Sequence, residues 1–219
     1  MLLDLVFPRS CVVCGSDGAV LCEVCEARLE RLGSPCCERC GAPTAWPVAR
    51  CRECAGRRIA FARARAAVAY DDSAKRLVGA WKERGQRTLA ELAAELVNGV
   101  VARPDADTIT FVPADQDRRL RRGHNPAQRL AEGLAASWRL PVVPLLERAP
   151  GRAPQKGLTL AERRRNVRGA FSPAGPVPSA VVLVDDVYTS GATVSAAASA
   201  LRKGGARRVE VVTFARAVR

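Results

Sequence analysis

Residues 181–193 constrain the fold of this chain more than any other stretch. They read Val-Val-Leu-Val-Asp-Asp-Val-Tyr-Thr-Ser-Gly-Ala-Thr. The first four are apolar without alternation, which is typical of a parallel strand buried on both faces. Asp185 and Asp186 follow at the expected end of that strand, and a helix-like run comes next. Because open α/β sheets bind ligands beyond the carboxyl ends of their strands, the stretch predicts an α/β fold with a ligand site here.

The loop after the two carboxylates suits a phosphate group. Backbone N–H groups and hydroxyls at a helix start can surround a phosphate, and the helix dipole adds about half a positive charge. The stretch has neither the Gly-Lys-Ser/Thr of a P-loop nor a G-x-G-x-x-G pattern. The alternative is an ordinary strand–turn–helix whose acidic pair caps the helix. The candidate phosphate-binding residues are Tyr188, Thr189, Ser190, Gly191, Ala192 and Thr193.

These thirteen residues resemble the motif with which type I phosphoribosyltransferases bind phosphoribosyl pyrophosphate (PRPP). The resemblance implies that Asp185 and Asp186 accept hydrogen bonds from the ribose 2′- and 3′-hydroxyls, as the catalytic pair. It also implies that residues 188–193 hold the 5′-phosphate. Mg²⁺ would be carried mainly by the pyrophosphate and hydroxyls of the ligand.

Eight of the nine cysteines form four Cys-x-x-Cys pairs within 44 residues. Two residues between thiolates allow one tight turn to present both sulfurs to one ion, and two such turns complete a tetrahedron around zinc. Repeated spacing of this kind favours metal over disulfides in a reducing compartment. The sequence therefore predicts two zinc sites, with Cys11, Cys14, Cys22 and Cys25 in the first and Cys37, Cys40, Cys51 and Cys54 in the second.

Both zinc sites are expected to be structural, because four sulfur ligands leave no position for a catalytic water. A module this small is also hard to stabilise without metal. We pair the cysteines sequentially, although spacing alone also permits a cross-braced arrangement. Cys36 is left over, and is expected to be a buried spectator beside Cys37 or an alternative ligand.

Composition bounds the remaining possibilities. The 219 residues leave room for one ordinary domain and a small module, and 48% hydrophobic residues can build a core. No apolar run approaches the about 20 residues of a membrane span, so no membrane insertion is expected. The start, Met-Leu-Leu-Asp-Leu-Val-Phe-Pro, lacks the basic region of a signal peptide. We interpret it as a short amphipathic helix ending near Pro8 and expect a cytoplasmic protein.

The positive charge is concentrated in the larger part of the chain. Residues 1–60 hold 8 Lys/Arg and 7 Asp/Glu, whereas residues 61–219 hold 27 and 15, a net charge of +12. Such a field suits a polyanion or a phosphate-rich ligand.

Beyond the cysteines, strand and helix patterns alternate, which predicts a parallel α/β sheet. We therefore expect a cysteine module over residues 1–58 and an α/β domain over residues 59–219. The resemblance to type I phosphoribosyltransferases, and the one described below, imply that these are a double zinc ribbon and a phosphoribosyltransferase-like domain. The expected strands cover residues 59–70, 108–113, 142–146, 181–184 and 209–214, and the expected helices cover residues 71–82, 89–101, 125–138 and 195–201.

Two further segments carry candidate phosphate ligands. Four arginines at positions 118, 119, 121 and 122 follow the strand expected over residues 108–113. They suit pyrophosphate or a nucleic-acid backbone, with Arg121 and Arg122 as the candidates for pyrophosphate; the alternative is a solvated loop. Gln155 and Lys156 lie in a Pro/Gly-rich segment over residues 148–160 and are the other candidates. His124 is the only histidine. We expect it to have a structural role, and a general acid or base role is the less favoured alternative.

Together these motifs resemble the ComF family of competence proteins. The resemblance implies a double zinc ribbon joined to a phosphoribosyltransferase fold, and members associated with the handling of single-stranded DNA in natural transformation. Family members usually have Gly-Phe-Asn-Gln where this chain has Gly-His-Asn-Pro at 123–126. The resemblance rests on the two cysteine quartets, Trp-Lys-x-Arg-Gly at 81–85, Val-Pro at 112–113, Arg-Leu-Arg-Arg-Gly-His-Asn at 119–125, Gln-x-Gly-Leu at 155–158, Arg-Arg-Arg-Asn at 163–166, Gly-Ala-Phe at 169–171 and the PRPP motif.

Three functions fit the sequence. The first is a phosphoribosyltransferase that displaces pyrophosphate from PRPP, although no base-recognition segment is identifiable. The second is a non-catalytic accessory protein that binds single-stranded DNA and acts with competence proteins. It is supported by the charge, but aromatics are only 5% and base stacking needs them. The third is a pocket that senses PRPP or a nucleotide without turnover.

Overall fold

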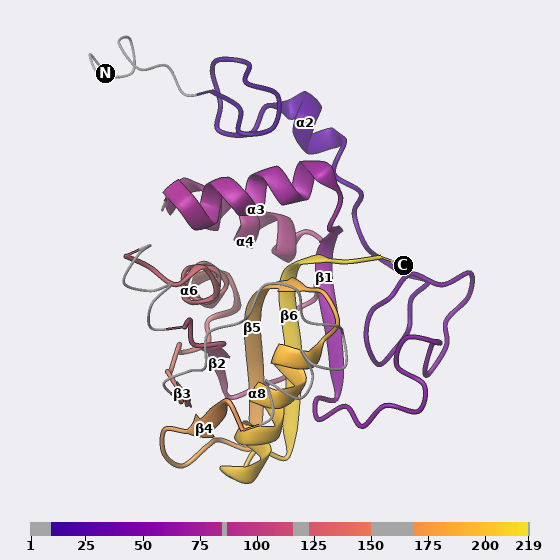
Figure 1. The fold of residues 1–219 in the computed structure, drawn as a ribbon, viewed down its shortest axis with the longest axis vertical. Helices are drawn as coiled ribbons and strands as arrows, with labels where there is room; N and C mark the ends of the chain where they lie inside the picture. The colour runs from indigo at the N-terminus through magenta and orange to yellow at the C-terminus, as the bar shows by residue number, and fades with distance from the viewer. Residues whose placement is uncertain (1–9, 85–86, 116–122, 150–168, 219) are drawn as a thin grey trace.

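The larger part of the chain is built on a four-stranded parallel sheet. The computed structural model describes residues 10–84, 87–115, 123–149 and 169–218. Strand order is β1-β6-β5-β2, and every pairing is parallel. Figure 1 shows α8 (Ala192–Lys203) in front of the sheet and α3 (Asp72–Arg84) across its upper end. The strands are β1 (Arg63–Ala69), β2 (Thr108–Phe111), β5 (Ala180–Tyr188) and β6 (Arg208–Arg216).

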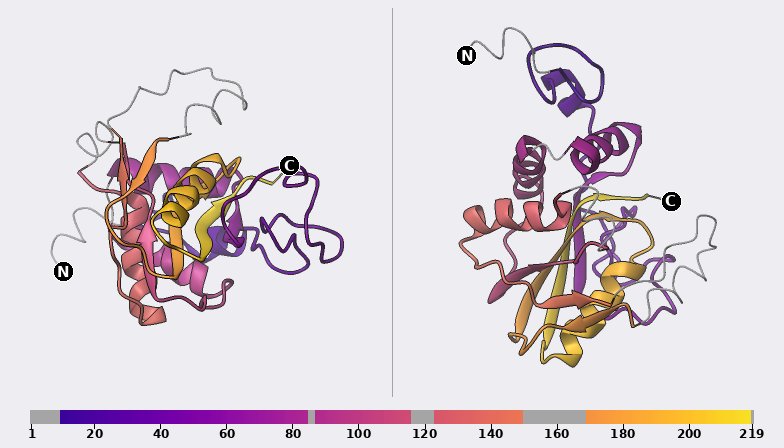
Figure 2. Two further views of the ribbon diagram at one scale, coloured as in Figure 1. Left: turned by 90° about the horizontal axis from the view of Figure 1, so that it is seen from below. Right: turned by 60° about the vertical axis from the view of Figure 1, so that its left-hand side comes forward.

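Alternate residues of the central strands serve two separate cores. Val182 and Val184 pack with α4 (Arg87–Asn98) and α6 (Pro126–Trp138), whereas Val181 and Leu183 pack with α8. The turned view in Figure 2 shows these helices on opposite sides of the sheet. A strand covered on both faces needs apolar residues at every position, which is why the run in β5 does not alternate. The predicted α/β class with a parallel sheet is confirmed.

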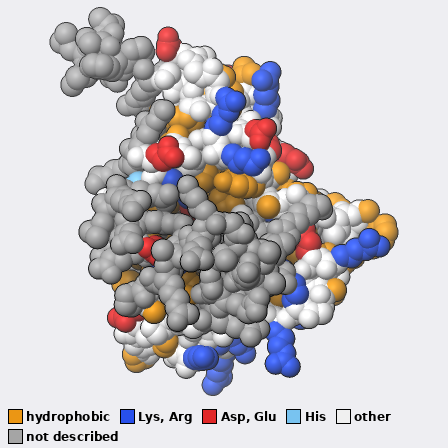
Figure 3. Space-filling model, in the orientation of Figure 1, with side chains coloured by type: hydrophobic (Ala, Val, Ile, Leu, Met, Phe, Trp, Pro, Cys, Tyr) orange, Lys and Arg blue, Asp and Glu red, His pale blue; other side chains and the backbone are white. Residues whose placement is uncertain are grey.

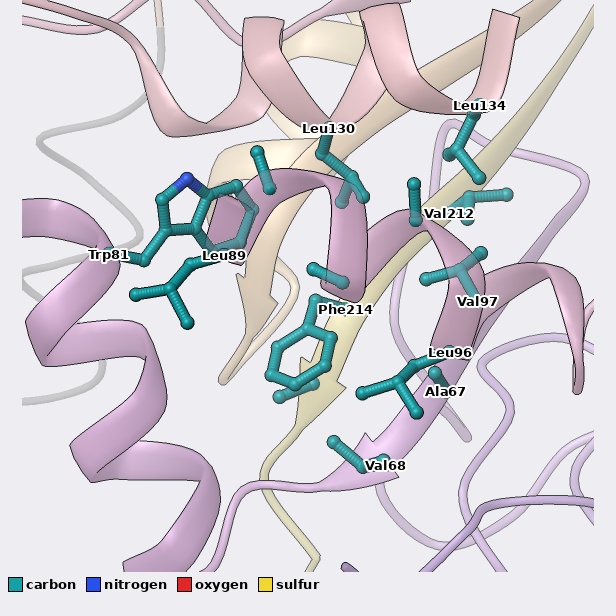
Figure 4. Close-up of a cluster of buried hydrophobic side chains, with 14 of the residues drawn as sticks. Ala67, Val68, Trp81, Leu89, Leu96, Val97, Leu130, Leu134, Val212 and Phe214 are labelled. Carbon is teal, nitrogen blue, oxygen red and sulfur yellow. The ribbon is translucent and has the colours of Figure 1, made fainter. Parts of the chain in front are cut away.

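The core under α4 and α6 joins the sheet to α3. Trp81 of α3 meets Phe214 of β6 edge to face, with ring centroids 6.4 Å apart. Figure 4 shows Leu89 beside Trp81 and Leu130 above Phe214. This packing fixes the carboxyl end of α3, including the residue after Trp81, above the carboxyl ends of the strands.

The strand expected over residues 142–146 is mostly wrong. Only Val142 bridges to Ile109, in parallel. Pro141 and Pro144 on either side lack the N–H that a longer ladder needs. The chain then forms β3 (Leu146–Arg148), which pairs antiparallel with β4 (Phe171–Pro173) in a separate sheet.

The other expected elements are present, with shifted ends. The first strand begins at Arg63 instead of residue 59, and β5 continues past residue 184 to Tyr188. Asp185 and Asp186 therefore lie within the last part of β5, where Asp185 pairs with Thr213. The expected helix before Pro8 lies outside the described residues.

The two cysteine modules lie on different sides of the sheet. The first, which includes the short helix α2 (Glu23–Ala27), packs into the core shared by α3, α4 and α6. The second packs into the core shared with α8. Between them, the N–H of Leu32 donates to the carbonyl of Ala67 (2.8 Å), so this linker covers the free edge of β1. The boundary at residue 58 stays a prediction.

Candidate ligand site and zinc centres

The eight paired cysteines form two compact clusters of sulfur atoms. Within each quartet all four Sγ atoms lie within 4.8 Å of one another. The distance between Sγ atoms is 3.7 Å for Cys14 and Cys22, and 3.5 Å for both Cys37–Cys54 and Cys40–Cys51. A tetrahedron with zinc–sulfur bonds of about 2.3 Å has edges of about 3.8 Å, so both clusters fit zinc. Sequential pairing is confirmed and the cross-braced alternative is excluded.

A glycine follows the first Cys-x-x-Cys turn of each quartet. Gly15 and Gly41 have φ of 81° and 69°, a region that side chains rarely adopt. Their N–H groups donate to the carbonyls of Cys11 and Cys37, each over 2.8 Å. Cys36 belongs to neither cluster and is partly exposed, so the expectation of a buried spectator is wrong in its burial.

The acidic pair faces a lysine that sequence reasoning did not assign. Lys82 Nζ lies 2.6 Å from Asp186 Oδ2, and the Asp186 side chain is 17% exposed. Lys82 belonged to the Trp-Lys-x-Arg-Gly motif, but nothing in that motif indicates its partner. The salt bridge forms because α3 ends above the strand that carries Asp186.

Asp185 is held in a different environment from its neighbour. Its Oδ1 accepts a hydrogen bond from the N–H of Asp186 (3.0 Å). Burial, followed by the adjacent charge of Asp186, raises the pKa of Asp185 to about 8, against the opposing charges of Lys82 and Arg148. A ligand that donates hydrogen bonds to Asp185 would favour its charged form and oppose this rise in pKa.

The loop after β5 is supported from below by Tyr188. Gly191 has φ of 70° and precedes the first residue of α8, while Ser190 Oγ accepts a hydrogen bond from the N–H of Ala192 (3.3 Å). A Cβ added at Gly191 would overlap the ring of Tyr188, which is buried at 3% exposure. The Tyr188 side chain therefore points away from the open side of the loop, where Thr189 is exposed. Binding of a phosphate by residues 188–193 stays a prediction, with Tyr188 contributing backbone only.

Five residues considered in the sequence analysis are not part of the site described above. Arg121, Arg122, Gln155 and Lys156 lie outside the described residues, and their roles stay predictions. His124 Nε2 lies 3.1 Å from the carbonyl oxygen of Trp81, a contact that favours the structural role.

Two arginines near the site were missed by sequence reasoning. Arg148 lies 3.8 Å from Asp115 and over the ring of Phe171. Arg216 is 1% exposed and lies over the Tyr188 ring, 4.6 Å from its centroid. The one sequence signal for Arg216 is its position, since it is a charged residue at the end of a strand that is otherwise buried.

Comparison with known proteins assigns the family. The chain is 32% identical to DNA utilization protein YhgH of Salmonella typhi over 94% of this chain and 96% of the relative. It is 29% identical to competence protein F of Haemophilus influenzae, with 90% of each chain covered, and 25% identical to competence protein ComFC of Streptococcus pneumoniae over 92% and 90%. Residues 2–55 match the double zinc ribbon domain.

This chain therefore belongs to the family of competence proteins F and ComFC and DNA utilization protein YhgH. Among solved structures, it is similar to the allosteric regulatory enzyme of purine biosynthesis (26% identity, TM-score 0.38, 57% of this chain and 24% of that one). It is also similar to a purine phosphoribosyltransferase from Pyrococcus horikoshii (18%, TM-score 0.33, 61% and 84%). At such scores these likenesses add nothing to the topology described above.

No helix among the described residues is long and apolar enough to cross a membrane. The cytoplasmic location stays a prediction.

Purified under reducing conditions, the protein is expected to hold two zinc ions per chain. Cys14→Ser and Cys40→Ser should each reduce the zinc content to about one, because each removes one of four ligands. Cys36→Ser, the matched control, should keep both ions. Elemental analysis measures the content, and a metal-free preparation with both ribbons still folded would refute the assignment.

The raised pKa of Asp185 predicts a pH-dependent stability difference. A carboxyl whose pKa is raised on folding destabilises the protein as pH rises from its ordinary value of 3.8 towards about 8. Asp185→Asn removes this titration. The unfolding temperature of the variant, relative to that of the wild type, should therefore rise between pH 4 and pH 8 and stay constant above pH 8.

The control for this experiment is Asp72→Asn. The hydrogen bond and charge of Lys75 lower the pKa of Asp72, so any pH-dependent difference there should have the opposite sign. Thermal unfolding at a series of pH values measures both. A difference for Asp185→Asn that does not vary with pH would contradict the raised pKa.

Proposed function

We propose that this chain binds PRPP, or a closely related ribose phosphate carrying a pyrophosphate, at the junction of β5 and α8. The observation that carries the proposal is the juxtaposition of the half-buried Asp185 and Asp186 with a glycine-containing hydroxyl loop at the start of a helix. Adjacent carboxylates accept hydrogen bonds from vicinal hydroxyls, and a helix start favours a phosphate. One ligand that presents both groups a few bonds apart is a ribose 5-phosphate.

Lys82 would exchange its partner Asp186 for the pyrophosphate when such a ligand binds. Its Nζ is paired with Asp186 Oδ2 at 2.6 Å. A ribose whose hydroxyls take over the carboxylates would release the ammonium towards the negative pyrophosphate. Mg²⁺ would enter with that pyrophosphate.

Transfer of the ribosyl group is the chemistry such a site would support. The bond from C1′ to pyrophosphate breaks, the leaving pyrophosphate takes the electron pair, and an acceptor forms the new bond to C1′. Catalysis would rest on positioning and on electrostatic stabilisation of the cationic sugar. The acceptor is not identified by any described residue, and a binding site without turnover is the other form of this proposal.

A second candidate function is binding of single-stranded DNA. It is favoured by the names of relatives, which include DNA utilization and competence proteins, and by an exposed basic cluster. Lys and Arg side chains gather at the lower end of the molecule in Figure 3. The cluster consists of Arg202, Lys203, Arg207 and Arg208, at the end of α8 and the start of β6. Binding of this kind would be electrostatic and would fall steeply with salt.

Replacing both acidic residues tests the first function. Asp185→Asn with Asp186→Asn should weaken PRPP binding at least tenfold, because each charge-assisted hydrogen bond contributes about 1.5–3 kcal/mol. Isothermal titration with PRPP and Mg²⁺ measures the dissociation constant. Asp107→Asn, at a strand start away from the loop, is the control and should bind as the wild type. Equal affinity of the double variant would remove the acidic pair from the ligand site.

Two charge variants separate DNA binding from ligand binding. Replacing Arg118, Arg119, Arg121 and Arg122 with Gln should weaken single-stranded DNA regardless of sequence and lower the salt slope by about 0.7 per lost phosphate contact. If the loop serves only pyrophosphate, PRPP affinity falls and the DNA slope is kept. We expect both to fall and PRPP to compete with DNA.

The second variant replaces the four cations of the basic cluster at the end of α8 with Gln, and should weaken DNA binding while PRPP affinity is kept. It removes the same charge without approaching the loop after β5. Fluorescence anisotropy with a labelled oligonucleotide at several salt concentrations measures both variants. Unchanged affinity of the residue 118–122 variant for both ligands would show those arginines to be solvated.

A further inference from the structure

The second zinc ribbon contacts the loop after β5 directly. Arg57 follows the last cysteine of that ribbon by three residues, and its Nη2 donates to the carbonyl oxygen of Ser190 over 2.6 Å. Its Nη1 donates to the carbonyl oxygen of Glu53, between Cys51 and Cys54 (3.0 Å). One guanidinium therefore bridges the zinc knuckle and the loop that we propose for phosphate.

A second, buried arginine makes the same connection from beneath. Arg216 donates from Nη1 to the carbonyl oxygen of Cys40 (2.8 Å) and from Nη2 to Glu53 Oε2 (2.6 Å). Its Nη2 also lies 3.7 Å from Cys40 Sγ, a zinc ligand. On its other side, the guanidinium lies over the Tyr188 ring. A buried cation is stable only when it is paired, and here its partners come from the second ribbon.

Tyr188 transmits the position of that cation to the loop. Its ring is wedged between Arg216 and Phe61, whose ring centroid is 6.3 Å away at an interplanar angle of 81°. The backbone of Gly191 rests on the same ring so closely that no Cβ fits between them. A shift of the ring must therefore move Gly191 and the first turn of α8.

We propose that the second zinc centre positions the phosphate loop, through Arg57 at Ser190 and through Arg216 and Tyr188 beneath Gly191. Both arginines are positioning residues, since they act through the loop backbone and not on the ligand. The inference rests on the proposed function for its effect on PRPP. Its structural part, that the second ribbon orders residues 189–193, stands apart from the identity of the ligand.

The first zinc centre provides an internal contrast. That ribbon contacts the other side of the molecule, where Arg76 of α3 donates to the carbonyl oxygen of Val13 over 2.8 Å. Its buried cysteines belong to the core under α4 and α6 and not to the core under α8. Loss of the first centre should therefore leave the phosphate loop in place.

The test uses full-length protein and two readouts. Hydrogen exchange of residues 189–193 without ligand reports loop order, and titration with PRPP and Mg²⁺ reports affinity. Arg57→Ala should speed exchange in the loop severalfold and weaken PRPP about tenfold, the effect of one lost charge-assisted hydrogen bond. Arg39→Ala is the matched control, because Arg39 lies in the same ribbon and donates to a carbonyl at 2.8 Å, but to Ile59.

Further variants separate positioning from general stability. Arg216→Met should speed loop exchange, while Arg216→Lys, which keeps the charge, should recover part of the protection. Cys51→Ser in the second centre should speed loop exchange and Cys22→Ser in the first should not, with zinc content measured for both. If Arg57→Ala, Arg216→Met and Cys51→Ser all leave loop exchange at the wild-type rate, the inference is overturned. If exchange changes as expected but the wild type does not bind PRPP, the inference holds and the proposed function fails.

Discussion

The parallel pairing of β5 with β6 places the acidic pair and Tyr188 at the candidate site. Its register places Asp185 opposite Thr213 and Tyr188 opposite Arg216. A shift of one residue would place Val187 or Thr189 opposite Arg216 and remove the Tyr188 ring from it. Two separate cores hold this register, because successive residues of β5 pack against α8 on one face and against α4 and α6 on the other. The strand that carries the acidic pair is therefore held on both of its faces.

The double zinc ribbon contributes to this arrangement on both sides. Neither cysteine module has enough apolar residues for a core of its own, so each packs on one layer of the α/β domain. Zinc coordination in each module would supply the stability that a larger hydrophobic core gives to other domains. Gly41 illustrates how closely the second module docks: a Cβ there would lie 2.5 Å from the carbonyl oxygen of Ala64 in β1. The ribbon is part of the packed structure and not a tethered appendage.

Features encoded by local pattern were predictable from the sequence. The Cys-x-x-Cys pairs specified both zinc centres, and the unalternating apolar run specified a buried parallel strand. Features that depend on tertiary contact were not. The salt bridge of Lys82 with Asp186 requires that α3 end above β5, and the burial of Arg216 requires that the second ribbon close over the end of β6. The strand expected over residues 142–146 does not form for a local reason, because Pro141 and Pro144 lack the N–H groups that a longer ladder needs.

A crystal structure of the full chain with PRPP and Mg²⁺ would test the central claim most directly. The account predicts the 5′-phosphate against the backbone of residues 189–193, the ribose hydroxyls on Asp185 and Asp186, and Lys82 no longer paired with Asp186. A ligand bound elsewhere, with the 2.6 Å salt bridge between Lys82 and Asp186 intact, would contradict it.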